Sequence, residues 1–189
     1  VSKTFAALAE RIVMAPLNLP AGEEAGLEHT AFFEASRQMV CFSAHACVVE
    51  VDIHSGRFKI LRYVTAEDVG TMINPEIVEA QVQGGVVQGL SNAMFEEFVY
   101  DPNGQQLTST FESYKLATAM DVPHIEVTDA GTPCPLTPLG SRGLGEGIPG
   151  PVAGALPNAI SDALAPFKIE ITELPVRPDK LWRLIQKAR

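Results

Sequence analysis

The stretch that most constrains this chain is rich in glycine and proline and spans residues 138–150, with the sequence PLGSRGLGEGIPG. Six of its last eleven residues are glycine or proline, and Glu146 is its only carboxylate. Glycine adopts backbone dihedral angles that are closed to other residues, and it lets the main chain approach a ligand closely. We therefore predict a loop moulded around a site, with Glu146 pointing into it; the alternative is a surface loop whose glutamate is solvated.

The segment after this loop predicts a rigid base for it. Residues 151–164 (PVAGALPNAISDAL) are small and mostly apolar, which is typical of a buried helix. Pro157 lies inside this segment and removes one main-chain hydrogen bond, so we expect a kink there.

A second informative segment predicts a helix over residues 74–98. Asn74 is a good N-cap, and Pro75 suits the first helical position, where a missing N–H costs nothing. Three glycines stand in the helix interior: Gly84, Gly85 and Gly89. Each costs about 1 kcal/mol relative to alanine, so we expect another main chain or a ligand to approach closely there. Gln81 and Gln88 share one helix face; they are either ligand contacts or solvated glutamines beside a tight helix crossing.

The remaining elements indicate an α+β fold, made of antiparallel hairpins and a mixed sheet with a few packed helices. Alternating residues over 45–53, a turn at 54–57 and a second strand over 58–65 predict an antiparallel hairpin. Further strands are expected at 124–128 and at 168–173. A short pair is also expected, with one strand ending at Tyr100 and the other over 107–111. Further helices are expected at 2–13 and at 178–187, and the second should turn Leu181, Trp182, Leu184 and Ile185 inward. We divide the chain into two parts. Residues 1–40 contain the N-terminal helix and an irregular arm over 14–37, and residues 41–189 form the main domain.

Composition disfavours several classes of function. A formal net charge of -9, from 14 Lys and Arg against 23 Asp and Glu, disfavours nucleic acid binding. No apolar run is long enough to span a membrane and no leader peptide is recognisable, so we expect a cytoplasmic protein. Three cysteines without a C-x-x-C pair suit a reducing compartment and predict no iron-sulfur or zinc site of standard spacing. His45 and His54 have no partner at metal-ligand spacing, so we treat them as ordinary polar residues.

Two motifs follow one another in order along the chain. Residues 68–75 (DVGTMINP) run into residues 81–89 (QVQGGVVQG), and PLG at 138–140 with GLGE at 143–146 comes later. Together they resemble the C-terminal part of the molybdopterin-binding (large) subunit of the xanthine dehydrogenase, aldehyde oxidase and aerobic carbon monoxide dehydrogenase family. The resemblance implies the C-terminal portion of a molybdenum cofactor-binding domain, and an oxidoreductase that is incomplete as this chain alone.

The resemblance also implies roles for individual residues. Glu146 matches the family's active-site glutamate, a base beside the molybdenum that takes a proton from hydroxide on the metal. The matching cofactor-binding positions are Gly84, Gly85, Gln88 and, less closely, Gln81 on the helix, with Arg142, Gly143 and Gly145 on the loop. No residue here is expected to ligate the metal itself. Family members often carry lysine where Arg142 stands, which changes the shape of the hydrogen-bond donor.

The family has cofactors and partners that this chain alone does not supply. The implied cofactor is molybdopterin in its cytosine dinucleotide form, with iron-sulfur clusters and FAD on partner chains. The implied partners are the N-terminal half of the molybdenum subunit, an iron-sulfur subunit, a flavin subunit and a small-molecule substrate. The alternatives are a non-catalytic binding or assembly module with the same fold, and a hydrolase that uses Glu146 as a base for water. The substrate, any part played by copper, the oligomeric state, and whether the chain is a split subunit or part of a longer one stay open.

Overall fold

A computed structural model describes residues 2–14, 19, 21–22, 26–34 and 39–189 of the chain. It divides into two compact units, residues 1–35 and residues 36–189. The first unit contains α1 (Phe5–Met14), which confirms the helix predicted over residues 2–13. No residue of α1 is buried, and Phe5 is 83% exposed. In the arm predicted over 14–37, the described residues after Met14 carry no helix or strand, and residues 15–18, 20, 23–25 and 35–37 lie outside the described residues.

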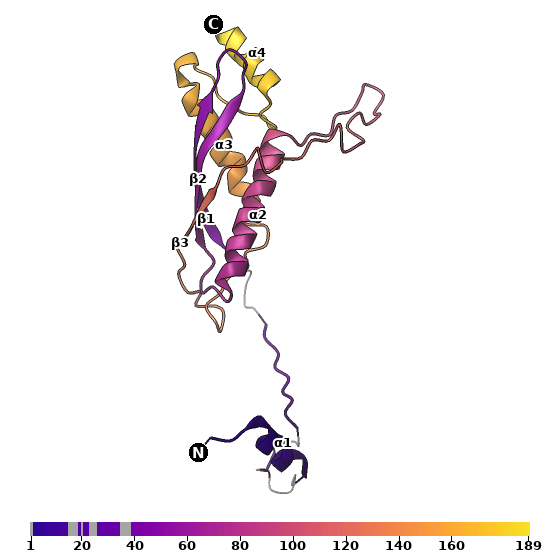
Figure 1. Cartoon of the computed structure of the whole chain (residues 1–189), viewed down its shortest axis with the longest axis vertical. Coiled ribbons are helices and arrows are strands. Elements are labelled where there is room, and N and C mark those ends of the chain that lie inside the picture. The colour runs from indigo at the N-terminus through magenta and orange to yellow at the C-terminus, as the bar shows by residue number, and fades with distance from the viewer. Residues whose placement is uncertain (1, 15–18, 20, 23–25, 35–38) are drawn as a thin grey trace. The chain divides into compact units, whose positions relative to one another are not determined.

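The second unit is built on a mixed sheet. β1 (Phe42–Val51) and β2 (Phe58–Asp68) form the predicted antiparallel hairpin, and both strands extend beyond their predicted bounds. β3 (Ile125–Asp129) pairs in parallel with the second half of β2, which gives the strand order β1-β2-β3. α2 (Pro75–Met94) and α3 (Pro149–Ala163) pack over one face of this sheet (Figure 1). The predicted α+β class is therefore confirmed.

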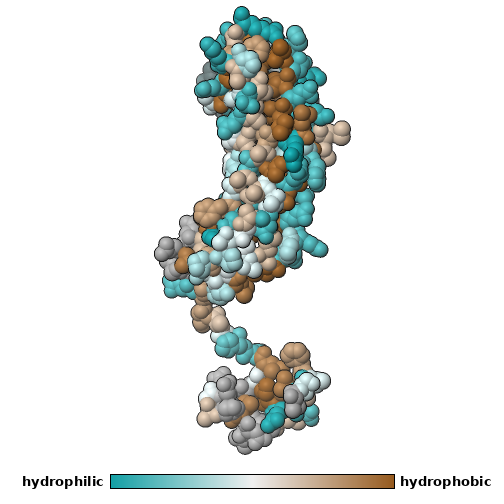
Figure 2. Space-filling model, turned by 90° about the vertical axis from the view of Figure 1, so that its left-hand side faces the viewer, coloured by the Kyte–Doolittle hydropathy of each residue, from teal (hydrophilic) through white to brown (hydrophobic). Residues whose placement is uncertain are grey.

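Burial alternates along β1 as its sequence predicts. Cys47, Val49 and Val51 turn toward the helices, while the residues between them face solvent. The Cys47 thiol donates to the Ala155 carbonyl of α3 at 3.4 Å, and burial raises its pKa to about 11. The face of β1 that points away from the helices exposes Val48. In the view of Figure 2, apolar and hydrophilic residues are interleaved on the surface of the chain.

α2 begins as predicted and ends early. The Asn74 side chain accepts a hydrogen bond from the Ile77 N–H at 3.2 Å, and Pro75 is the first helical residue. The helix ends at Met94 and does not continue to Phe98, because the backbone of Phe95 leaves the helical region with φ −134° and ψ −40°.

Two of the three glycines of α2 are explained by α3. A Cβ at Gly85 would lie 2.7 Å from the Ile148 side chain, and a Cβ at Gly89 would lie 2.7 Å from that of Val152. The predicted close approach at these two positions is confirmed, and the neighbour is a helix. Gly84 differs, because a Cβ there would meet nothing within 4 Å.

The strand predicted over residues 168–173 is wrong. This segment follows the short 3-10 helix η2 (Ala165–Phe167) and belongs to no strand. Its main chain bonds to α3, since the Ile171 N–H donates to the Ser161 hydroxyl at 3.0 Å, and Ile169 is buried in the core. The apolar alternation that indicated a strand therefore packs against a helix.

The strand pair predicted at Tyr100 and over 107–111 is also wrong. It is reduced to one isolated bridge between Tyr100 and Gln106. The Asp101 carboxylate accepts the Asn103 and Gln105 N–H groups at 2.8 and 2.9 Å, which holds a turn between the two sides of this bridge.

α4 (Pro178–Ala188) confirms the predicted final helix but not all of its inward face. Leu181 and Ile185 are fully buried, whereas Trp182 is 44% exposed and Leu184 is 38% exposed. The prediction that the latter two face inward is wrong, because neither side chain belongs to the core or packs against it.

The glycines of α2 give a test of this packing. Gly89→Ala should lower the free energy of unfolding by about 1–3 kcal/mol, because the new methyl group overlaps α3. Gly84→Ala is the matched control and should raise it by about 0.5–1 kcal/mol, since alanine favours the helix and the space is open. Chemical denaturation followed by circular dichroism measures both values, and equal effects of the two substitutions would contradict this packing.

Candidate functional site

The glycine-rich loop is attached to the end of β2. Gly70 and Ser141 form an antiparallel bridge, and the Thr71 N–H donates to the Gly140 carbonyl at 2.9 Å. Arg142 continues this pairing through its own N–H, which donates to the Val69 carbonyl at 2.8 Å. Within residues 138–150, all of which are described, Gly140 alone has positive φ, at +74°. The special backbone conformation expected of the loop therefore occurs where the loop pairs with the residues that follow β2.

Asp68 organises this attachment. Its carboxylate accepts the Gly70 N–H at 3.0 Å and the Thr132 N–H at 2.9 Å, and the Arg142 Nε lies 3.5 Å away. These main-chain hydrogen bonds, from Thr132 first and then Gly70, lower the pKa of Asp68, and the guanidinium adds to the shift. One carboxylate thus joins the end of β2 to two points on the segment that leads to Glu146.

The far side of the loop is held by the residues before β1. Val40 and Gly143 form a parallel bridge. A Cβ on Gly147 would overlap the sulfur of Cys41, so glycine is needed there for close packing. The loop is therefore fixed on this side by the main chain of one residue and the side chain of another.

The loop also meets α2. The Gln81 side-chain amide donates to the Gly145 carbonyl at 3.0 Å, which brings together two segments that the sequence singled out separately. The Gly147 N–H donates to the Leu144 carbonyl at 3.3 Å and closes a turn with Glu146 near its tip. In this turn Glu146 is exposed. The main chain of the turn that carries Glu146 is thus held next to the glutamine-bearing face of α2.

The other predicted site residues have different surroundings. Gly84 and Gln88 are exposed on α2, while Gly85 is buried against α3. Gly143 and Gly145 are exposed on the loop. Arg142 is engaged within the chain: besides Asp68, its guanidinium donates to the Thr132 carbonyl at 3.4 Å and lies 5.4 Å from the centre of the Phe42 ring.

These groups suit an organic cofactor better than a bare metal ion. A Cβ at Gly84 or at Gly145 would meet nothing within 4 Å, so main chain is open on both the helix and the loop. Beside them stand the side-chain amides of Gln81 and Gln88, which can both donate and accept hydrogen bonds. Among the described residues no group of three or more His, Cys, Asp or Glu could hold a metal ion. Amide groups of this kind can bond to the ring edges of a pterin or nucleotide.

Sequence reasoning missed one polar group. His45, expected to be an ordinary polar residue, is buried on the inward face of β1 and bonds to Tyr63 and Glu67 of β2. The available signal was the period-two alternation, which places all three side chains on the same face of the hairpin.

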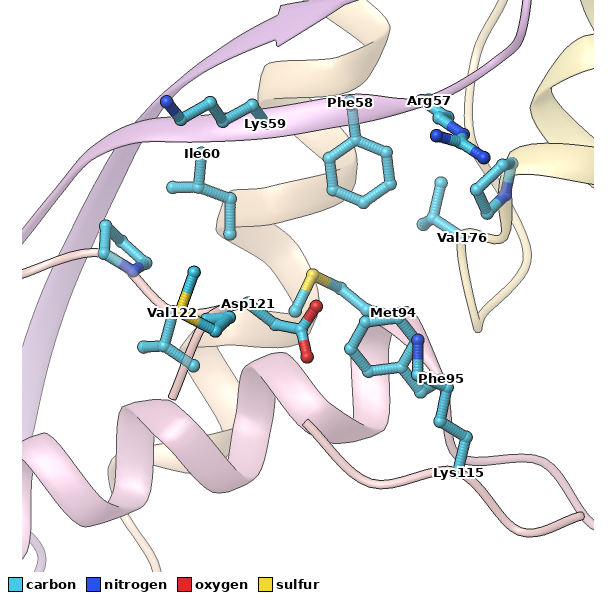
Figure 3. A pocket seen from close by; sticks show the side chains of 13 residues that line it. Arg57, Phe58, Lys59, Ile60, Met94, Phe95, Lys115, Asp121, Val122 and Val176 are labelled. Carbon is cyan, nitrogen blue, oxygen red and sulfur yellow. The ribbon is translucent and has the colours of Figure 1, made fainter. Parts of the chain in front are cut away.

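A cavity of about 560 Å³ lies elsewhere, between β2 and the C-terminal part of α2. Phe58 and Ile60 of β2 face Met94 and Phe95 across it, with Asp121 between them (Figure 3). None of the sequence-predicted site residues lines it, so it is separate from the loop and its helix face.

Residues 1–123 match the family described as molybdopterin cofactor-binding domain. The chain belongs to this family, that of the molybdenum-binding subunits of xanthine dehydrogenase and carbon monoxide dehydrogenase. No helix among the described residues is both long and apolar enough to cross a membrane.

Relatives include the nicotine 6-hydroxylase large subunit of Paenarthrobacter nicotinovorans, 42% identical over 165 residues, which are 87% of this chain and 20% of that subunit. The carbon monoxide dehydrogenase large chain of Hydrogenophaga pseudoflava is 32% identical over 188 residues, 98% of this chain and 23% of that one. The crystal structure of quinoline 2-oxidoreductase from Pseudomonas putida 86 matches with a TM-score of 0.92 and 36% identity, over 98% of this chain and 24% of that one. The chain thus spans less than a quarter of these relatives' length.

Asp68 gives a pH-dependent test of the loop attachment. Because its pKa is lower in the folded chain, its contribution to stability is present above its unfolded pKa, about 3.9, and is lost as pH falls through the folded value. Asp68→Asn should therefore show a smaller loss of unfolding free energy than the wild type between about pH 5 and pH 2. Denaturant titrations across this range measure both slopes, and identical slopes would rule out the attachment.

Proposed function

We propose that this chain supplies the active-site glutamate and part of the molybdopterin-binding surface of a molybdenum hydroxylase-type oxidoreductase. The observation that carries the proposal is the hydrogen bond from Gln81 to the Gly145 carbonyl. This hydrogen bond supports the proposal because it holds the turn that carries Glu146, the only carboxylate of the loop, against α2, in a chain that belongs to a molybdopterin-binding family.

Glu146 is the proposed general base. When bound, the molybdenum cofactor supplies the oxidising chemistry at an electron-poor carbon of the substrate. The carboxylate oxygens of Glu146 accept the proton that must leave during this reaction. The anchors at Gly140, Gly143, Gly145 and Gly147 hold the loop on several sides, which limits the freedom of the carboxylate before substrate arrives.

The cofactor-binding surface combines helix and loop. Gln88 and Gly84 on α2, with Gly143 and Gly145 on the loop, offer amide groups and open main chain to a molybdopterin cofactor in its cytosine dinucleotide form. Gln81 contributes while holding the loop. Two further positions, Gly85 and Arg142, act from behind this surface, since Gly85 lets α3 approach and Arg142 supports the loop through Asp68.

The rest of the enzyme lies on other parts of the protein. We assign the remaining cofactor contacts to the N-terminal half of the molybdenum subunit, and electron transfer to iron-sulfur and flavin subunits, because the described residues hold no cysteine cluster for this purpose. The three cysteines of the chain are free thiols, which accords with a cytoplasmic complex.

The names of two relatives support a proposal for the substrate class. The nicotine hydroxylase and the quinoline oxidoreductase, at 42% and 36% identity, are both named for nitrogen heteroaromatics. The carbon monoxide dehydrogenase chains share 32% or 33%. We therefore propose a nitrogen heteroaromatic substrate, which a turnover assay over a panel of such rings, with aldehydes and carbon monoxide as comparison, identifies directly.

The assembled enzyme carrying Glu146→Gln tests the catalytic role. Its kcat should fall by about 10²- to 10⁴-fold, because the amide cannot accept the proton, while its molybdenum content measured by mass spectrometry stays at the wild-type level. Glu170→Gln, at an exposed position away from the loop, is the control and should keep wild-type kcat. Full turnover in Glu146→Gln would favour a non-catalytic module, and turnover without molybdenum would favour a hydrolase.

A further inference from the structure

A buried polar cluster lies inside the hairpin near the glutamate loop. We call it the His45 cluster; its members are His45 of β1 and Tyr63, Thr65 and Glu67 of β2. Thr65 is directly opposite His45 in the strand register, and the three β2 residues alternate along the same inward face. The cluster is therefore a product of strand pairing and not of any local motif.

Hydrogen bonds join three of its members in a row. His45 Nδ1 lies 3.0 Å from the Tyr63 hydroxyl, and His45 Nε2 lies 3.1 Å from a Glu67 carboxylate oxygen. The His45 and Glu67 side chains are 1% and 0% exposed. Burial raises the pKa of Tyr63, so its hydroxyl keeps its proton and can donate to Nδ1. The Nε2–H then donates to Glu67, which fixes the orientation of the ring.

Two atoms of the cluster have no protein partner. The Thr65 hydroxyl and the second carboxylate oxygen of Glu67 are buried without a hydrogen bond to any described residue. Buried polar atoms are almost always paired, and an internal water molecule is the usual partner where protein groups are lacking. One water between these two side chains can donate to Glu67 and also bond to the hydroxyl of Thr65.

A core of this kind is not needed for stability alone. Apolar side chains of similar volume stabilise a protein interior as well as a buried charged pair does, or better. The position of the His45 cluster indicates another use, because Glu67 lies at the end of β2 beside Asp68, where the loop is attached.

Cys41 links the cluster to the loop. Burial raises the pKa of the Cys41 thiol, and the nearby carboxylates of Glu67 and Asp68 raise it further. The sulfur of Cys41 in turn occupies the space where a Cβ of Gly147 would stand, one residue after Glu146. The strand register supports this link, because Ser43 lies directly opposite Glu67 and Cys41, two residues before Ser43, falls on the same face of the hairpin. Cys41 is thus a neighbour of Glu67 on the sheet and packs against Gly147 of the loop.

We propose that the His45 cluster, completed by one internal water molecule on Thr65 and Glu67, is a positioning device for the loop that carries Glu146. The cluster fixes the position of Cys41 relative to the sheet, and Cys41 packs against Gly147. The catalytic consequence rests on the proposed function, whereas the support of the loop does not. His45 and Glu67 are positioning residues, since they act through Cys41 and touch no reacting atom.

The test measures how fast iodoacetamide alkylates Cys41 in the assembled enzyme, by mass spectrometry of the peptide that contains it. Glu67→Ala should raise this rate about tenfold or more, because it leaves His45 unpaired in the interior. Glu67→Gln should stay within about threefold of the wild type, since the amide restores most hydrogen bonds. The matched control is Glu126→Ala, which removes a carboxylate paired with Arg62 on the exposed face of the sheet and should leave the rate unchanged.

Cys47 distinguishes loop release from general unfolding, because its thiol bonds to α3 and its alkylation should stay at the wild-type rate in every variant. If Glu67→Ala does not assemble, Tyr63→Phe removes only one hydroxyl and should still raise Cys41 alkylation about threefold. The proposal would be overturned if Cys41 alkylation stayed unchanged in the assembled cluster variants. It would also be overturned if kcat fell in these variants without a rise in Cys41 alkylation. A high-resolution crystal structure without water between Thr65 and Glu67 would overturn the water site. Full turnover in Glu146→Gln would refute the proposed function alone.

Discussion

The close packing of α2 on α3 is the contact on which the rest of the structure depends. Gly85 and Gly89 carry no side chain toward α3, so Ile148 and Val152 lie directly against the main chain of α2. The two helices then share one core with the inward face of the hairpin. Because α3 begins at Pro149, straight after the glutamate turn, the contact that holds the core together also fixes where that turn ends. The same pair of glycines therefore affects both the packing of the core and the end of the turn that carries Glu146.

The start of the loop is fixed by different physics. At the end of β2 the chain relies on main-chain hydrogen bonds and on the carboxylate of Asp68, which joins segments distant in sequence. Hydrogen bonds are directional, so they restrict the orientation of the loop relative to β2. The apolar contact between the helices is not directional and mainly restricts the distance of the loop from the core. A loop held by both kinds of contact has little freedom, even though residues 138–150 contain few side chains large enough to pack.

The hairpin, α2, α3 and α4 could be predicted because their signals are local: alternation, an Asn-Pro start, an apolar run and an amphipathic end. The strand expected over 168–173 could not be corrected from sequence, since its alternation is genuine and only the bond from Ile171 to Ser161 shows that a helix is its partner. At the site, Gln81 and the loop were each recognisable, but their hydrogen bond depends on the tertiary fold. From sequence, the three glycines of α2 predicted the close approach of either another main chain or a ligand. The structure separates them, because Gly85 and Gly89 face α3 and its first residues, whereas the space at Gly84 is open. The pairing of His45 with Glu67 depends on strand register, which no local pattern states.

The distribution of engaged and unengaged groups bears on function. Asp68, Arg142, Gln81 and Cys41 are all occupied in holding the loop, and their partners lie within the chain. Glu146 on the loop and Gln88 and Gly84 on α2 are exposed, and no side chain stands on Gly84 or Gly145. A surface loop with no task does not require four anchors of different chemistry, nor glycines kept open beside them. This division between a rigid frame and a small set of exposed polar groups is what a binding surface shared with a larger protein requires, because the frame sets the geometry before the remaining parts and the cofactor arrive.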